Sequence, residues 1–203
     1  MGKGRGLFGP SREEIWRKLS EDLHARYVEG GFWTGDRVEA THGEWTITLD
    51  THAVTTGQTT IRYTRMRAPY VNPDGFRFTV YREGQFSEIA KWFGMQDAEV
   101  GYEPFDRDFI IKGTDGYKLR QLFSNDRIRE LLTRQPNVHF CVRDDEGLFG
   151  PKFPDGVDEL RFTVTGVMKD PELLKQLYDL FAETLDQLCR IGSAYAGDPH
   201  LKV

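Results

Sequence analysis

Apolar residues recur at helical spacing near both ends of the chain. Near the N-terminus, the sequence SREE at residues 11–14 is typical of a capping box, and Gly30 and Gly31 are typical of a helix end. The apolar positions between them are Ile15, Trp16, Leu19, Leu23 and Tyr27. This pattern predicts an amphipathic helix over residues 12–29 with one buried face.

A broader apolar stripe follows Asp170, which can cap a helix that has Pro171 at its first position. The stripe comprises Leu173, Leu174, Leu177, Tyr178, Leu180, Phe181, Leu185, Leu188 and Ile191. It predicts a final helix that runs to about Tyr195 and packs on a sheet, because a lone sheet needs a cover. A dimer seam along the same stripe is the alternative.

Between these helices, apolar and polar residues alternate as they do in strands. We expect strands at residues 38–55, 60–70, 76–84, 104–113 and 158–168, and a strand, turn and short return within 137–150. The turns TTGQTT and VNPDG are too short for a helical crossover, so the strands beside them should pair antiparallel. Short helices are expected at residues 86–94, 117–123 and 126–135.

These elements predict an α+β fold. In this fold a curved antiparallel sheet of about six to eight strands is covered by the N-terminal and C-terminal helices. We expect residues 1–203 to form a single domain, with residues 1–10 as a flexible lead.

Composition narrows the class of protein. The chain has 203 residues, of which 38% are hydrophobic and 29% charged, as is usual for a soluble globular protein. A net charge of −5 disfavours nucleic acid as a partner, because that affinity comes mostly from neutralising phosphates. No apolar stretch approaches the roughly 20 residues of a membrane span, so stable membrane insertion is not expected. Two cysteines form no disulfide framework, and we predict a cytoplasmic location.

Two carboxylates stand at the start of a predicted strand, in the sequence FDRDFIIKG at residues 105–113. On a strand, Asp106 and Asp108 would share one face at a separation of roughly 7 Å. That spacing suits the acid and base of a hydrolase or lyase, and equally a strand start whose acids meet arginines. The sequence has no G-x-S-x-G, P-loop, H-E-x-x-H or C-x-x-C motif, which weakens the catalytic interpretation.

Arginines cluster on the strand predicted at 60–70. Tyr63, Arg65 and Arg67 share one face, and Arg77 would lie near them if strand 76–84 pairs back across VNPDG. Guanidinium groups bind carboxylate or phosphate through paired hydrogen bonds, so the four residues form a candidate ligand-binding site for an anion. The alternative is an internal network with the two aspartates above or with nearby glutamates.

Potential metal ligands occur on the strand predicted at 38–55. His42, Glu44, Asp50 and His52 share the face opposite its apolar residues. The two ends of this set lie roughly 20 Å apart on an extended strand, so each pair would need a further ligand, such as His139. A solvated polar face is the alternative, and we assign no cofactor.

Aromatic residues are abundant in the N-terminal half. They are Phe32, Trp33, Trp45, Tyr63, Tyr70, Phe76, Phe78 and Tyr81. Core packing accounts for most of such a set, and a surplus could line a cleft for an apolar or planar ligand.

The segment FDRDFIIKGTDGYKLRQLF, followed by IRELL, resembles part of a family of bacterial proteins that are grouped as a domain of unknown function. The resemblance covers residues 102–132: an aromatic–acid pair leads a strand, and a helix with paired leucines follows. It implies no reaction, cofactor or catalytic residue.

The combination of many aromatic residues with no assembled catalytic set predicts a non-catalytic ligand-binding or protein-binding module, whose partner is a protein or a small molecule. Two alternatives stay open. One is a hydrolase or lyase that uses Asp106 and Asp108, with Arg65 and Arg67 binding an anionic substrate. The other is a peripheral lipid-binding adaptor that uses the C-terminal helix. A homodimer is compatible with each.

Overall fold

The computed structural model describes residues 9–31, 35–82, 95–144, 153–197 and 199. Within them, nine strands form one open antiparallel sheet in the order β1-β2-β3-β4-β9-β8-β5-β7-β6. The strands are β1 (Arg26–Val28), β2 (Arg37–His42), β3 (Trp45–Thr56), β4 (Thr59–Val71), β5 (Phe78–Arg82), β6 (Gln96–Asp97), β7 (Phe109–Gly113), β8 (His139–Arg143) and β9 (Val157–Thr165). The predicted α+β class is confirmed, with one strand more than the upper number expected.

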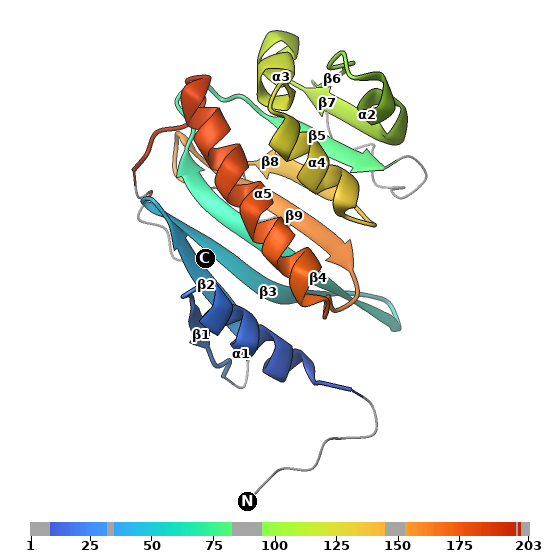
Figure 1. Ribbon diagram of the computed structural model, residues 1–203, viewed down its shortest axis with the longest axis vertical. Helices are drawn as coiled ribbons and strands as arrows, with labels where there is room; N and C mark the ends of the chain where they lie inside the picture. Colours follow the sequence, from blue (N-terminus) through green and yellow to red (C-terminus); the bar gives the residue numbers. More distant parts are fainter. Residues whose placement is uncertain (1–8, 32–34, 83–94, 145–152, 198, 200–203) are drawn as a thin grey trace, which may run out of the picture.

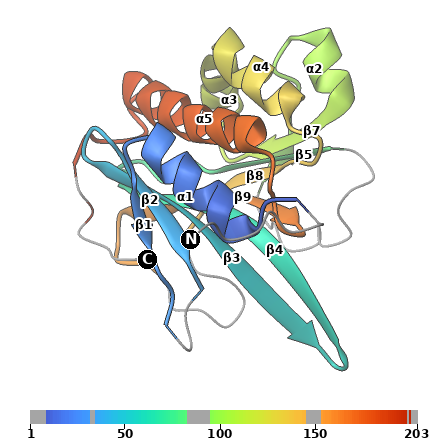
Figure 2. The ribbon, with the colours of Figure 1, turned by 60° about the horizontal axis from the view of Figure 1, so that its bottom comes forward.

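Five helices belong to the described residues, and they lie on one face of the sheet (Figures 1 and 2). They are α1 (Arg12–Asp22), α2 (Glu103–Asp108), α3 (Gly116–Phe123), α4 (Asp126–Arg134) and α5 (Pro171–Arg190). Helix α5 crosses the middle of the sheet, as its apolar stripe predicts. Its Phe181 ring lies 5.6 Å from the ring of Phe140 on β8, centroid to centroid, and both residues are fully buried.

The first helix ends earlier than its apolar spacing predicts. The capping box between Ser11 and Glu14 is present, but α1 stops at Asp22 instead of residue 29. His24 has a φ of +51°, a left-handed conformation that ends a helix. The following residues form β1, so Tyr27 is a strand residue paired with Val38 and not part of the helix.

The strand predicted at 38–55 is a hairpin of β2 and β3. Gly43, with a φ of +57°, and Glu44 form a two-residue turn, and His42 pairs with Trp45. The strand predicted at 104–113 is also wrong in its first half, where the chain forms α2 before entering β7. In the first case the alternation of polar and apolar residues continues across the two-residue turn, and in the second it continues through the short helix α2. Local alternation therefore does not reveal where the chain changes direction.

The strands beside the VNPDG turn do not pair with each other. β4 pairs with β9 from Tyr63 to Val71, and β5 pairs with β7 and β8. The last strand of the chain therefore lies between β4 and β8 and joins the N-terminal meander to the other half of the sheet. We expected β4 and β5 to form a hairpin, because they are neighbours in the sequence. The sequence does not reveal that a strand from much later in the chain lies between them.

The helices predicted at 117–123 and 126–135 are present in the described residues, but the final helix ends at Arg190, before the predicted Tyr195, because Gly192 has a φ of +75° and Tyr195 pairs with Val71. Asp115 caps α3 and Asn125 caps α4, and Asp170 accepts hydrogen bonds from the first turn of α5. Most of the aromatic set is core: Trp45, Tyr70, Phe76, Phe78 and Tyr81 are at most 3% exposed. The helix predicted at 86–94, the return predicted near 145–150, Phe32 and Trp33 lie outside the described residues.

Candidate functional site

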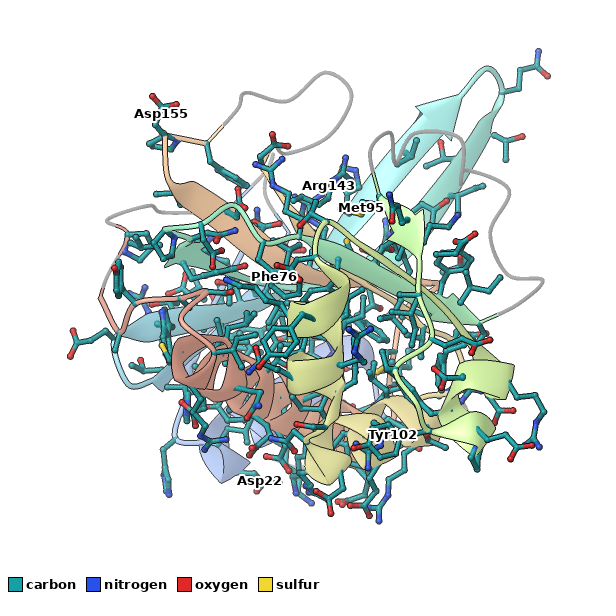
Figure 3. The ribbon with its side chains drawn as sticks, turned by 90° about the horizontal axis from the view of Figure 1, so that it is seen from above. Asp22, Phe76, Met95, Tyr102, Arg143 and Asp155 are labelled. Carbon is teal, nitrogen blue, oxygen red and sulfur yellow. The ribbon has the colours of Figure 1, made fainter. Side chains whose placement is uncertain are left out.

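The face of the sheet opposite the helices carries charged side chains near its centre. On β4, Met66, Ala68 and Tyr70 belong to the core beneath the helices, so Arg65 and Arg67 point to the other face. Figure 3 shows the same division: Phe76 lies between the sheet and the helices, and Arg143 lies on the opposite side. We call this second side the open face.

Asp50 on β3 joins the two arginines of β4. Its carboxylate accepts hydrogen bonds from Arg65 Nε (2.9 Å) and Arg65 Nη2 (2.8 Å), and a third from Arg67 Nη2 (2.9 Å). The side chains of Asp50, Arg65 and Arg67 are 11%, 14% and 9% exposed. The predicted face of Arg65 and Arg67 is therefore real, and it is occupied by a carboxylate of the same chain.

A second carboxylate, Glu159 on β9, continues this network. Glu159 Oε1 accepts a hydrogen bond of 2.5 Å from Arg161 Nε, and its Oε2 lies 4.0 Å from Arg67 Nη1. Glu159 is fully buried and Arg161 is 5% exposed. We call these five residues, Asp50, Arg65, Arg67, Glu159 and Arg161, the arginine–carboxylate cluster.

Burial has an electrostatic cost in this cluster. It lowers the pKa of Arg67 below its usual value, although Asp50 and Glu159 act in the opposite direction. Arg67 Nε has no acceptor, and Glu159 Oε2 has no hydrogen-bond donor, in the structure of the described residues. Such a cluster holds its strands in a fixed register, because breaking one pair leaves a buried charge without compensation.

Among the strands of the described residues, only β3 and β4 continue beyond the cluster. β2 pairs with β3 only as far as Leu49, and β9 pairs with β4 only as far as Tyr63. β3 and β4 continue together to the two-residue turn at Gly57–Gln58, where Gly57 has a φ of +60°. We call residues 52–63 the arm. It projects from the body of the molecule in Figure 2.

The arm exposes apolar side chains on the open face. Val54 and Ile61 are cross-strand partners, and each is 42% exposed. His52 and Tyr63 form the next pair toward the cluster on the same face. Partial burial, followed by the positive charge of Arg65, lowers the pKa of His52 below its usual value. Between Ala53 and Ile61 the arm has no charged side chain.

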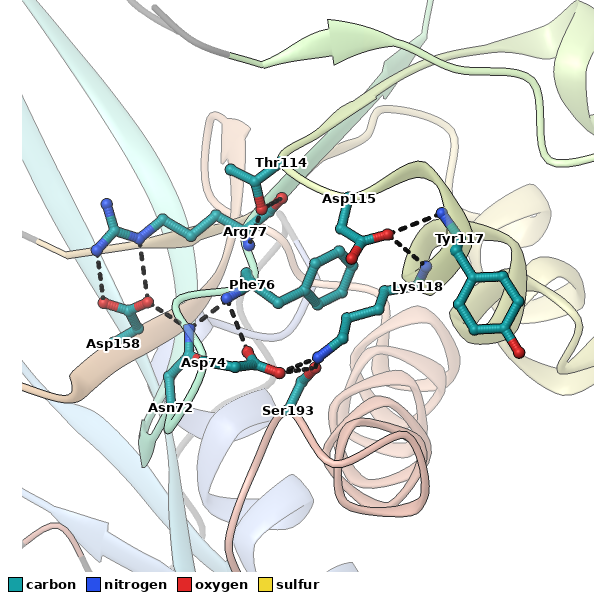
Figure 4. A network of polar contacts seen from close by, with 10 residues as sticks. All are labelled: Asn72, Asp74, Phe76, Arg77, Thr114, Asp115, Tyr117, Lys118, Asp158 and Ser193. Atoms are coloured by element: carbon teal, nitrogen blue, oxygen red, sulfur yellow. Dashed lines mark hydrogen bonds and ion pairs between the residues drawn. The ribbon is translucent and has the colours of Figure 1, made fainter.

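Arg77 is not part of the arginine–carboxylate cluster. It binds both oxygens of Asp158 (Nε to Oδ2, 3.1 Å; Nη2 to Oδ1, 3.3 Å) and donates to Asp144 (2.9 Å), as Figure 4 shows in part. Asn72 also donates to Asp158, at 2.6 Å. Burial raises the pKa of Asp158 despite these donors. The predicted grouping of Arg77 with the β4 arginines depended on a β4–β5 hairpin that the fold does not have.

The same region joins three other elements (Figure 4). Lys118 of α3 contacts Asp74, which follows β4, and donates to Ser193, which follows α5, at 3.0 Å. Asp74 also accepts the backbone N–H of Phe76 at 2.9 Å. These contacts are between groups of the chain itself, so this network locks the ends of β4, α3 and α5 together.

Asp106 and Asp108 lie on α2, which packs against β7 near one edge of the sheet, whereas the cluster lies on the central strands. Asp106 accepts the backbone N–H groups of Val100, Gly101 and Tyr102 at 2.8–2.9 Å, which makes it a loop-closing residue. Asp108 contacts its neighbour Arg107 and lines an open pocket of about 570 Å³ between α2 and α4. The structure does not bring these aspartates to Arg65 and Arg67, as the hydrolase or lyase alternative requires.

The four potential metal ligands are also separated. His42 faces the helices, where its Nε2 lies 3.0 Å from Asp186 Oδ1 of α5, and Glu44 is in an exposed turn. Asp50 is bound by arginines, and His52 is on the arm. Among the described residues, no three histidine, cysteine or acidic side chains come together as a metal site would require. The shared face expected for these residues does not form, because the β2–β3 turn puts His42 on the face of Trp45.

Two features of the site escaped sequence reasoning. Glu159 and Arg161 complete the cluster, and the alternation within DELRFTV could have placed both on one face of the last strand. The arm could have been found from the length of the two strands beside Gly57, which exceeds the usual five or six residues.

In the described part of the chain, no helix is long and apolar enough to cross a bilayer.

Comparison with known proteins adds little. No protein-family model matches the chain, and no curated protein matches it. Among solved structures, the chain is similar to the mycobacterial trehalose monomycolate transport factor A, TtfA, with 7% sequence identity and a TM-score of 0.47. The similarity covers 94% of this chain and 98% of the other. A likeness at that level carries no argument about function, and the resemblance of residues 102–132 to a bacterial family stays a prediction.

Proposed function

We propose that the protein is a non-catalytic protein-binding module and that the arm is its contact element. The observation that carries this proposal is the exposure of Val54 and Ile61 on a ribbon that has left the sheet. Natural proteins usually protect such free strand edges with charged residues, proline or a bulge. The arm has none of these between Ala53 and Ile61.

The base of the arm supports this function. A two-stranded ribbon with both faces in water is marginally stable by itself. Here the ribbon grows out of strands that the arginine–carboxylate cluster holds in register: Asp50 pairs with Arg65 across the two strands, directly below His52 and Tyr63. A contact element with a fixed base loses less conformational entropy on binding than a free loop does.

The other two functions considered from sequence have less support. An anion site at Arg65 and Arg67 would compete with Asp50 and Glu159, which already bind these guanidinium groups or lie beside them. A lipid contact through α5 would need an apolar stripe that packs instead on the sheet. As part of the proposal we place the module in the bacterial cytoplasm, where the thiols of Cys141 and Cys189 would stay reduced.

The experiment is site-specific photo-cross-linking in cells that produce the full chain at its natural level. The photoreactive amino acid p-benzoylphenylalanine replaces Val54 in one strain and Ile61 in another. Tyr117, which is 64% exposed on α3, is replaced in the control strain. We expect both arm positions to cross-link to the same polypeptide, identified by mass spectrometry, and the α3 position not to. Absence of cross-links at the arm, or equal cross-linking at all three positions, refutes the proposed function.

A further inference from the structure

The free edge of the arm can be derived from its turn. In a hairpin with a two-residue loop, the closing pair exchanges both backbone hydrogen bonds, and hydrogen-bonded pairs alternate from there. Thr56 and Thr59 close the turn, so Val54 and Ile61 also bond to each other. Ala53 and Thr55 then direct their N–H and C=O groups outward. On the other strand of the arm, the same alternation directs the carbonyl of Arg62 outward. This carbonyl accepts the N–H of Gly166 at 2.8 Å, which agrees with the derivation.

No described residue pairs with this edge of β3. Pairing with β2 ends at Leu49, and Gly35 lies against Thr51, so the stretch of this edge that has no described neighbour runs from His52 to Thr56. The outward groups of Ala53 and Thr55 are placed symmetrically about Val54. Such an edge is complementary to itself, since a two-fold axis at Val54 sets Ala53 of one copy opposite Thr55 of the other.

We propose that the partner of the arm is a second copy of this chain, which adds its own β3 edge antiparallel to the first with Val54 at the two-fold axis. This inference rests on the proposed function, because it names the partner of the same arm. Ala53 and Thr55 exchange their backbone hydrogen bonds across the axis. The two Val54 residues form a non-hydrogen-bonded pair, whose Cα atoms are about 4.5 Å apart.

Charge and side-chain packing favour a second copy. The chain carries a net charge of −5, so most approaches of two copies are repulsive. The arm does not add to this repulsion, because no charged side chain lies between Ala53 and Ile61. The two-fold axis also aligns Ile61, Val54, Val54 and Ile61 in one row on the open face. An isologous contact of this kind closes the assembly at two copies.

The size of the contact sets the expected strength. Five residues of a strand span roughly 17 Å, so the paired edges bury much less than the ~800 Å² per partner that a stable interface needs. The dimer should therefore be weak and reversible, with a dimer fraction that rises with protein concentration. Sedimentation velocity over a wide concentration range measures this rise directly.

Disulfide trapping tests the register. In Val54→Cys, the Cα separation at the axis suits a disulfide, so mild oxidation should give covalent dimers. In the matched control Ile61→Cys, exposure is the same, but three strand spacings separate the two sites by about 14 Å, so no dimer should form. Both variants retain Cys141 and Cys189, and the wild type measures any background from them.

The outcomes separate this inference from the proposed function. Dimers of Val54→Cys alone, with wild-type self-association, support the inference. Equal trapping of both variants, or a wild type that stays monomeric at every concentration and no trapping, overturns it. If the protein is monomeric and the arm cross-links in cells to a different polypeptide, the proposed function stands and the second copy is wrong. If the arm gives no cross-link to any polypeptide, both fail.

Discussion

Replacing Asp50 with alanine tests whether the arginine–carboxylate cluster fixes the base of the arm. The Asp50 carboxylate accepts three hydrogen bonds, two from Arg65 and one from Arg67. Asp50→Ala leaves both guanidinium groups on the open face without that carboxylate. The variant should fold, because the helix-covered face of the sheet is unchanged, and it should be clearly less stable.

The magnitude follows from burial. Removing one partner of a buried ion pair costs about 3–5 kcal/mol. Because the side chain of Arg65 is 14% exposed and keeps some solvation, we expect the lower end, a loss of about 3 kcal/mol in the free energy of unfolding. For a domain of this size the melting temperature should then fall by about 6–12 °C.

Urea unfolding followed by circular dichroism measures the loss, and Glu44→Ala, in an exposed turn, is the matched acid-to-alanine control. Adding Arg67→Met to Asp50→Ala should recover part of the stability, because the double variant no longer buries the positive charge that Asp50 balances. A loss below about 1 kcal/mol for Asp50→Ala, or a double variant that is less stable by the sum of both changes, would show that the cluster is not a buried network.

Two further predictions concern other parts of the sheet. Burial, with Arg143 and Arg161 nearby, lowers the pKa of His139 to about 4. The unfolded state therefore binds the proton more tightly than the folded state. The resulting contribution to the free energy of unfolding is fully present above pH ~6.5 and is lost as the pH drops toward 4. Across this window the wild type should lose about 2 kcal/mol more than His139→Gln, and parallel pH profiles would contradict this. In Gly113→Ala, the new Cβ would lie 2.7 Å from Cδ1 of the buried Leu119. Unfolding by urea should show a loss of about 1–3 kcal/mol, whereas Gly116→Ala, which meets no atom closer than 3.7 Å, should be neutral or slightly stabilising.

Features that depend on neighbouring residues could be predicted from the sequence. The capping box at Ser11–Glu14 and the N-cap at Asp170 depend on side chains within a few residues, and both are present. The pairing of Asp50 with Arg65 was also within reach: counting outward from the Gly57–Gln58 turn places these residues opposite each other. This pairing was missed because Asp50 was grouped with the potential metal ligands, and Asp106, Asp108 or nearby glutamates were considered as partners of the arginines.

The pairing of strands that are distant in the sequence could not be predicted from it. β9 reaches β4 across some ninety residues of chain, and only that pairing brings Glu159 and Arg161 to Arg67. The same insertion removes Arg77 from the group. Local alternation also gave no sign that α1 ends at Asp22, because the left-handed backbone of His24 that follows is a property of one residue in its tertiary setting. A candidate site assembled from several strands is therefore less predictable than the strands themselves.

The position of β9 has a consequence for how the chain folds during synthesis. Residues 26–71 can form their meander early, but β4 keeps an unpaired edge until residues 157–165 leave the ribosome. β8 waits for the same strand on its other side. Contacts of such high sequence separation slow folding and leave strand edges exposed to other nascent chains. β9 thus joins the two halves of the sheet, and the time between translation of β4 and β9 is the interval in which this protein is most prone to aggregate.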